Sequence, residues 1–467
     1  MNMHSFLVPR VFLPIMRKMD FHDTTYWVRY ADHLEKSQWD SREELDARLC
    51  LKLGRMLRHA YANVPFYRKQ FDSHGINPDD IRTLEDMNHL PVTARSDIVA
   101  HYPEQMLAAG VPGKLRVPGF TSGSTGSPMY FYNDRQELMI KNAVHNFVRG
   151  WLGTGMWDTE ITIGVSSYFY KEKALKKAFL RAVFGQHSIN VSGMDCTLDD
   201  FLRIIRTLPG HRRYSIRTYP SYLALYSSEM IERGIGPDRK PDVIVAGAEA
   251  LSDHRASLIE QAFARRPLRH YGCKELGYIA LTCPDNPENM HILGEQLIVR
   301  VVDERGKQVK PGHRGRVLVT NLYNRVMPFI NYEIGDNAVA GSPCTCGRGF
   351  HTIRSIEGRI GEVLRLPGGG TVSEAAVNPI VRTLHLPNGV LRELQLVQTA
   401  EDEVCIMAVP SKTFTEEHRD RMLVHFSRML RGMKTRIETV DGIRVSPSGK
   451  RPLIVPLEKM NAANDND

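Results

Sequence analysis

The chain has 467 residues, of which 42% are hydrophobic and 24% charged, a composition that excludes a disordered protein and allows a large buried core. Lysine and arginine outnumber aspartate and glutamate by 61 to 53, but the basic residues are scattered along the chain, which argues against nucleic-acid binding. No apolar stretch reaches the ~20 residues that cross a bilayer, and no secretory cleavage site follows the N-terminal apolar runs. We therefore expect a cytoplasmic protein without a transmembrane segment, of two or three structural units.

The first strong pattern is a helix that begins near residue 41. Ser41 and Glu44 have the spacing of a capping box, in which each side chain bonds to the backbone of the other residue. Apolar residues follow at helical spacing from Leu45 to Ala60. This apolar stripe predicts a helix that packs on the body of the protein.

The middle of the chain alternates short β-rich runs with helical patterns, which is typical of α/β layered proteins. The β-rich runs are 160–166 and 242–247, and the helical patterns are 197–207 and 219–233. Later, two extended runs flank a hairpin turn at 303–306, and 316–323 is another expected strand. This part is expected to form antiparallel or mixed sheets.

The C-terminal part contains enough elements for a small domain of its own. A glycine-rich patch at 367–370, a hairpin around 400–403 and a helix at 416–430 predict an α+β domain. We therefore predict an α/β fold in which a large layered N-terminal body with mixed sheets, residues 1–357, is joined to a small mobile α+β domain, residues 358–467.

Phe120 to Pro128 reads FTSGSTGSP, a run that can wrap a polyphosphate. Glycines free the backbone to curl, and backbone N–H groups and hydroxyls can donate hydrogen bonds to phosphate oxygens. The run lacks the lysine pattern of the P-loop in nucleoside triphosphatases. On its own, such a run is more often a flexible loop than a phosphate site.

The string TSGSTG-x-P resembles the signature loop of the acyl-adenylate-forming superfamily, which includes the acyl-CoA synthetases. That resemblance implies that the loop binds the β- and γ-phosphates of ATP through Thr121, Ser122, Gly123, Ser124, Thr125 and Gly126. Many members carry a lysine just after the proline, whereas this chain has Met129 and Tyr130. Other groups must therefore neutralise the phosphate charge.

Four further motifs follow in the order of the family, and the resemblance implies a role for each. Gly247, Ala248 and Glu249 are similar to the loop that contacts adenine. In HYGCKELG, Tyr271 and Gly272 match the family's adenine-binding positions, and Glu275 would bind Mg²⁺. Taken alone, this string is also typical of a strand-to-helix turn.

The last two motifs imply a ribose site and a catalytic lysine. Asp336 in YEIGD would accept hydrogen bonds from the ribose hydroxyls, and Arg359 would reach the ribose from the hinge. The usual hinge aspartate is missing, because Gly361 stands in its place. Lys450 in SPSGK would approach the acid carboxylate and the α-phosphate, where an ammonium stabilises the charge that builds in the transition state.

The N-terminal strings NVPFY, at 63–67, and Leu90-Pro91 resemble the phenylacetate-CoA ligase and capsule-biosynthesis branch of the superfamily. The expected activity is that of an AMP-forming acid–thiol ligase that uses ATP, Mg²⁺ and coenzyme A. The acid is not marked by any motif, and a homodimer is an open expectation from this branch. Two alternatives stay open: a different acceptor, such as a carrier protein, a polysaccharide precursor or a cofactor that receives AMP, or a degenerate non-enzymatic homologue.

Four further residues have the ligand types of a structural zinc site. Cys283, Cys344 and Cys346 supply thiolates and His291 an imidazole, the donor set of a closed tetrahedral site. Cys-x-Cys is tighter than the usual spacing, so Thr345 must turn sharply. The resemblance also implies zinc, because some members of the branch bind it at similar positions; the alternative is a group of free buried thiols.

Overall fold

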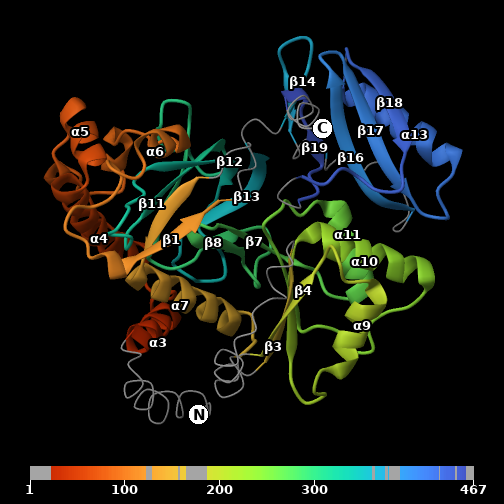
Figure 1. Ribbon diagram of the computed structural model, residues 1–467, viewed down its shortest axis with the longest axis horizontal. Coiled ribbons are helices and arrows are strands. Elements are labelled where there is room, and N and C mark those ends of the chain that lie inside the picture. Colours follow the sequence, from red (N-terminus) through yellow and green to blue (C-terminus); the bar gives the residue numbers. More distant parts are fainter. Residues whose placement is uncertain are drawn as a thin grey trace. The chain divides into compact units, whose positions relative to one another are not determined.

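The computed structural model of the chain describes residues 23–121, 129–155, 158–164, 187–359, 363–373, 377, 390–430, 432–446 and 450–458. The chain forms two compact units, each made of two segments: 1–153 with 271–355, and 154–270 with 356–467. Figure 1 labels many of their elements. Within the described ranges, no helix is long and apolar enough to cross a membrane.

Helices make up most of the first segment of the first unit. They are α3 Asp23–Ser37, α4 Arg42–Asn63, α5 Pro65–Ser73, η2 Pro78–Asp80, η3 Asp86–His89, α6 Arg95–His101, η4 Gly113–Leu115 and α7 Arg135–Trp151. The predicted capping box begins α4: the Glu44 N–H donates to Ser41 Oγ at 3.2 Å, and the Ser41 N–H donates to Glu44 Oε2 at 3.0 Å. The predicted stripe of α4 is buried, so this prediction is confirmed.

The first unit also contains two antiparallel groups of strands. The hairpin of β1 Arg116–Phe120 and β2 Tyr130–Asp134 pairs Phe120 with Tyr130. The larger group has the order β10-β11-β12-β13-β9-β8. Its strands are β8 Gly277–Thr282, β9 Met290–Ile292, β10 Leu297–Val302, β11 Arg314–Asn321, β12 Tyr332–Ala340 and β13 Thr352–Arg359.

The turn predicted at 303–306 is present, and the short run after it lies against the end of β10. The Asp303 N–H donates to the Lys307 carbonyl at 2.9 Å, which closes the turn. Beyond the turn an isolated bridge joins Val302 to Gln308, and the Val309 N–H donates to the Val301 carbonyl at 2.9 Å, whereas β10 pairs along its length with β11. The expected antiparallel sheet is therefore confirmed, with a different main partner for its edge strand.

A parallel sheet forms the core of the first segment of the second unit, in the order β4-β3-β5-β6-β7. Its elements are β3 Thr159–Gly164, β4 His187–Ser192, α9 Leu198–Thr207, β5 Tyr214–Thr218, α10 Pro220–Arg233, β6 Val243–Ala246, α11 Asp253–Phe263 and β7 Leu268–Cys273. Figure 1 shows α9, α10 and α11 together on one side of β3 and β4. Apolar residues of these helices and strands form one buried cluster, which confirms the expected α/β alternation.

The second segment of this unit forms an α+β fold. Strands β14 Val363–Arg365 and β15 Thr371–Ser373 pair with each other, and a sheet of order β18-β17-β16-β19 follows. This sheet comprises β16 Leu391–Ala400, β17 Glu403–Pro410, β18 Lys434–Thr439 and β19 Ile454–Val455, and helix α13, Glu416–Met429, packs against it through Met422 and Phe426. The hairpin and helix predicted here are confirmed, whereas the domain boundary near 358 and the mobility of the domain stay predictions.

Candidate active site

The β1–β2 hairpin brackets the predicted phosphate loop. At its base the Thr121 N–H donates to the Met129 carbonyl at 2.9 Å, and the Met129 N–H donates to Thr121 Oγ1 at 3.1 Å. Of the predicted loop residues, Ser122, Gly123, Ser124, Thr125 and Gly126 lie outside the described residues. The structure therefore describes the two strands that hold the loop, together with Thr121.

Two cations to which the motifs assigned no role lie near the residues that lead into the loop. The Arg95 guanidinium, at the start of α6, donates to Thr121 Oγ1 at 3.0 Å. Lys274 Nζ lies 4.9 Å from the ring centroid of Phe120, the last residue of β1. Both cations are thus close to the residues that lead into the loop.

Glu275 lies in the turn between β7 and β8, and it is buried. Lys141 Nζ, from α7, donates to the Glu275 carbonyl at 2.8 Å, and the Tyr332 hydroxyl donates to Glu275 Oε1 at 3.4 Å. Burial and the nearby Glu275 carboxylate raise the pKa of Tyr332 above its usual range, so its hydroxyl stays protonated and can donate. The same two causes raise the pKa of Cys273, which keeps this neighbouring thiol neutral.

Tyr271 and Asp336 come from different motifs and meet in the structure. The Tyr271 hydroxyl, near the end of β7, donates to Asp336 Oδ2 in β12 at 2.8 Å, and both residues are buried. Gly272 follows Tyr271 in the same strand. The residues expected near adenine and ribose are therefore joined within the first unit.

The second unit holds the other residues predicted for nucleotide binding and catalysis, beginning with the loop after β6. Gly247 is in close contact with its surroundings, because a Cβ there would lie 2.7 Å from His270 Nδ1, and Ala248 has a φ of +68°. Glu249 Oε1 accepts from the Arg451 N–H at 2.9 Å, and Glu249 Oε2 accepts from the Ser221 N–H at 3.3 Å. The Glu249 carboxylate thus contacts the C-terminal segment, a contact that no motif indicated.

Lys450 lies in that C-terminal segment and Arg359 ends β13. The Lys450 N–H donates to Ser446 Oγ at 3.0 Å, and the Ser446 N–H donates to the Lys450 carbonyl at 2.8 Å. Gly358, just before Arg359, has a φ of +94°, a conformation that favours glycine. Gly361 lies outside the described residues.

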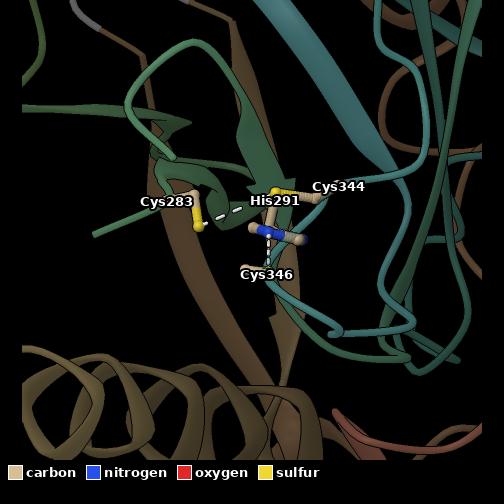
Figure 2. A group of neighbouring side chains, drawn as sticks. All are labelled: Cys283, His291, Cys344 and Cys346. Carbon is tan, nitrogen blue, oxygen red and sulfur yellow. Dashed lines mark hydrogen bonds between the residues drawn. The ribbon is translucent and has the colours of Figure 1, made fainter. Parts of the chain in front are cut away.

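The four predicted zinc ligands converge in the first unit. Cys283 follows β8, His291 lies in β9, and Cys344 and Cys346 come from the loop between β12 and β13; their donor atoms all lie within 4.8 Å of one another. Cys344 Sγ is 3.8 Å from Cys283 Sγ, and Cys346 Sγ is 3.3 Å from His291 Nε2. Figure 2 shows the four side chains gathered together. Around a tetrahedral zinc ion with Zn–S bonds of about 2.3 Å, two sulfurs lie about 3.8 Å apart, so the group fits zinc.

The loop that supplies two of these ligands is held by Arg348. Its guanidinium carbon lies 4.8 Å from the ring centroids of both Trp39 and Trp151. Its Nε donates to Gln38 Oε1 at 2.9 Å, and its backbone N–H donates to Cys346 Sγ at 3.5 Å. These contacts fix the loop against the end of α7 and against the segment between α3 and α4.

Comparison with known proteins identifies relatives of both the sequence and the fold. Residues 364–456 match the family model of the CapK C-terminal domain. The chain is 26% identical to the phenylacetate-coenzyme A ligase of Thermus thermophilus over 332 residues, which is 70% of this chain and 73% of that protein. It is also 26% identical to the Escherichia coli phenylacetate-coenzyme A ligase over 364 residues, which is 76% of this chain and 80% of that protein.

A solved structure has the same fold over nearly the whole chain. A 2-hydroxyisobutyryl-CoA ligase, in the postadenylation state and in complex with 2-HIB-AMP, superposes with a TM-score of 0.73 at 18% identity, covering 93% of this chain and 94% of that one. By sequence the chain is therefore similar to the phenylacetate-CoA ligases, and by fold to the 2-hydroxyisobutyryl-CoA ligase.

Proposed function

We propose that the protein uses MgATP to convert a carboxylic acid into an acyl-adenylate and pyrophosphate, and then transfers the acyl group to a thiol, coenzyme A, with release of AMP. The observation that carries this proposal is the buried pair of Tyr271 and Asp336 in the unit that also holds Glu275 and the phosphate-loop hairpin. The names of the relatives support it, because they are CoA ligases and one was solved with an acyl-AMP bound.

In the first step, a carboxylate oxygen attacks the α-phosphorus of ATP and the bond to pyrophosphate breaks. We assign the ammonium of Lys450 to the developing charge between these two anions. The loop residues Thr121 to Gly126 would bind the β- and γ-phosphates, and the loop Gly247 to Glu249, with Tyr271 and Gly272, would contact adenine. The ribose hydroxyls would donate to Asp336 and be reached by Arg359.

Glu275 fits a role as the magnesium ligand. It supplies a buried carboxylate, the hard oxygen donor that Mg²⁺ prefers, and the Tyr332 hydroxyl orients one of its oxygens. A bound Mg²⁺ would neutralise phosphate charge while pyrophosphate leaves.

Many members of the superfamily carry a lysine at the position of Met129. In this chain, the positive charge for the phosphates would come from Arg95 and Lys274. Met129 is buried, with its sulfur 3.9 Å from the Tyr332 hydroxyl, so this side chain packs inward. A lysine there would have to bury an ammonium, which is costly without a paired anion. Arg95 and Lys274 place positive charge at the base of the loop, from which both can reach phosphate oxygens.

For the second step we propose that the small domain, from residue 358, rotates about Gly358 and Arg359. The positive φ of Gly358 marks a backbone conformation that few other residues adopt, as suits a pivot. The closed site would exclude water from the adenylate, and the rotated one would admit the thiol. None of the seven cysteines, all of which lie in the described ranges, is in a disulfide, which supports a cytoplasmic location, where thiols stay reduced.

We also propose that Cys283, His291, Cys344 and Cys346 bind one structural Zn²⁺. Four protein donors would fill its coordination sphere, so it would stabilise the loop and take no part in catalysis.

The experiment that tests the function incubates the purified protein with MgATP and a panel of aryl, fatty, amino and hydroxy acids, with and without coenzyme A. Mass spectrometry follows AMP, pyrophosphate and acyl-CoA. Acid-dependent AMP and acyl-CoA are the expected products. AMP without acyl-CoA would point to another acceptor, and no ATP binding with any acid would contradict the proposal.

A further inference from the structure

Arg451, the residue directly after the proposed catalytic Lys450, is held through both its backbone and its side chain. Its N–H donates to Glu249 Oε1 at 2.9 Å, and its carbonyl accepts from Arg255 at 2.9 Å. Its guanidinium donates to both oxygens of Glu393, at 2.8 and 2.9 Å. Two parallel hydrogen bonds to a carboxylate fix an arginine in orientation as well as in position.

These contacts join parts of the second unit that are far apart in sequence. Glu393 lies in β16 of the C-terminal sheet, whereas Glu249 lies in the loop after β6 of the parallel sheet. Only 5% of each of these two glutamate side chains is exposed. Buried carboxylates need charged or polar partners, so loss of the Arg451 contacts would be costly.

The contacts also restrict Lys450. The next residue, Arg451, is held through its N–H, its carbonyl and its side chain. The Lys450 backbone itself is hydrogen-bonded to Ser446, four residues earlier. An ammonium that must lie between two anions in a transition state depends on such placement, because a misplacement of about 1 Å can cost about 100-fold in rate.

We propose that Glu249, Glu393 and Arg451 form a latch: Glu393 holds the Arg451 side chain within the small domain, the Arg451 N–H bonds to Glu249 and so positions Lys450 for adenylate formation, and this bond to Glu249 opens before thioester formation. This inference rests on the proposed two-step function and adds positioning residues to it. Glu249, which the sequence placed at adenine, then acts through Arg451. The alternative is a permanent interface that serves both steps equally.

The test measures the two half-reactions separately in Arg451→Gln and Glu393→Gln. Acid-dependent ATP–pyrophosphate exchange reports adenylate formation, and conversion of a synthetic acyl-adenylate with coenzyme A, without ATP, reports the second step. We expect exchange to fall by about 10- to 100-fold and the second step to change by less than about 2-fold. The double variant should lose no more than either single variant, because the pair acts as a unit.

Arg436→Gln is the matched control. Arg436 donates to Glu403 at 2.8 Å on an open face of the same C-terminal sheet, away from Lys450 in sequence, so both half-reactions should stay unchanged. Thermal unfolding would verify that every variant is folded. Equal losses in both half-reactions would overturn the latch, because a permanent interface predicts them.

A measurement without substrate separates the latch from the proposed function. Hydrogen exchange measured at single-residue resolution should show a protected Arg451 amide, and Glu249→Ala should speed its exchange by about tenfold or more. An unprotected Arg451 amide in the wild-type protein would overturn the latch, whatever the activity. If the Arg451 amide is protected but no acid supports ATP–pyrophosphate exchange, the latch contact is supported. The ligase function, and the role of the latch in it, are then contradicted.

Discussion

We expect the Lys141 ammonium to stabilise the folded protein, and in particular the turn that carries Glu275. Its Nζ lies 2.8 Å from each of three oxygens: Glu137 Oε1, Asn133 Oδ1 and the Glu275 carbonyl. Glu137 is buried and also accepts from Asn321 Nδ2 at 2.6 Å. Burial raises the pKa of Glu137 and the charge of Lys141 opposes this shift, so the carboxylate depends on the lysine to stay ionised.

Lys141→Met would leave the Glu137 carboxylate buried without its cation. Removal of one partner of a buried ion pair costs about 3–5 kcal/mol, and we expect the free energy of unfolding at pH 7 to fall by that amount. The loss should shrink as the pH is lowered, because protonation of Glu137 removes the uncompensated charge. Urea unfolding followed by far-UV circular dichroism measures both effects.

A double variant and an exposed lysine provide the controls. Lys141→Met with Glu137→Gln removes both charges and should recover more than about 2 kcal/mol of the loss. Its adenylate formation should stay impaired, because the Glu275 carbonyl has lost its donor. Lys434→Met breaks an exposed pair with Asp402, 3.1 Å apart, and should cost less than about 1 kcal/mol. The reasoning is refuted if Lys141→Met costs as little as Lys434→Met, or if the double variant is no more stable than Lys141→Met.

Three further predictions concern zinc, pH and ATP. The purified protein should contain about one zinc per chain by plasma mass spectrometry, and Cys346→Ser should lower both the zinc content and the thermal midpoint; full zinc content in this variant would exclude Cys346 as a ligand. Burial lowers the pKa of His254, whose ring nitrogen is 3.0 Å from the Leu391 carbonyl, to about 4. The unfolded state therefore binds the proton more readily, so below about pH 6.5 the free energy of unfolding should fall by up to about 1.4 kcal/mol per pH unit, and urea unfolding of His254→Asn should lack this component. Arg95→Met and Lys274→Met should each raise the KM for ATP by about tenfold with little effect on the KM for the acid, and an unchanged KM for ATP in both would contradict their role at the phosphates.

Local signals in the sequence predicted the elements well. The capping box at Ser41 satisfies the first backbone N–H groups of α4, and the stripe from Leu45 to Ala60 supplies its buried face, so neighbouring residues alone determine this helix. The turn at 303–306 is local in the same way, because Asp303 bonds within it. The partner of β10 is not local: β11 begins at Arg314, and no short pattern states which strand lies beside which.

The motifs indicated which residues form the candidate site but not what holds them. Tyr271 and Asp336 were each expected near the nucleotide, yet only the structure shows that they bond to each other. Lys141, Arg95 and Arg451 had no distinguishing pattern, because single cations are common on protein surfaces. Their roles depend on contacts with residues 26 to 202 positions away, which sequence spacing cannot reveal.

Met129 shows how a departure from a family motif can be understood once its surroundings are known. The side chain is buried beside Tyr332, whose hydroxyl also faces Glu275, so an apolar residue at this position helps to enclose the proposed magnesium ligand. Phosphate is recognised by charge and by hydrogen-bond donors, whatever their position in the sequence. The Arg95 guanidinium, which donates to Thr121 from α6, can therefore replace an ammonium in the loop. We therefore expect the positive charge for the phosphates to come from Arg95 in α6 and not from a lysine at position 129, with phosphate binding preserved.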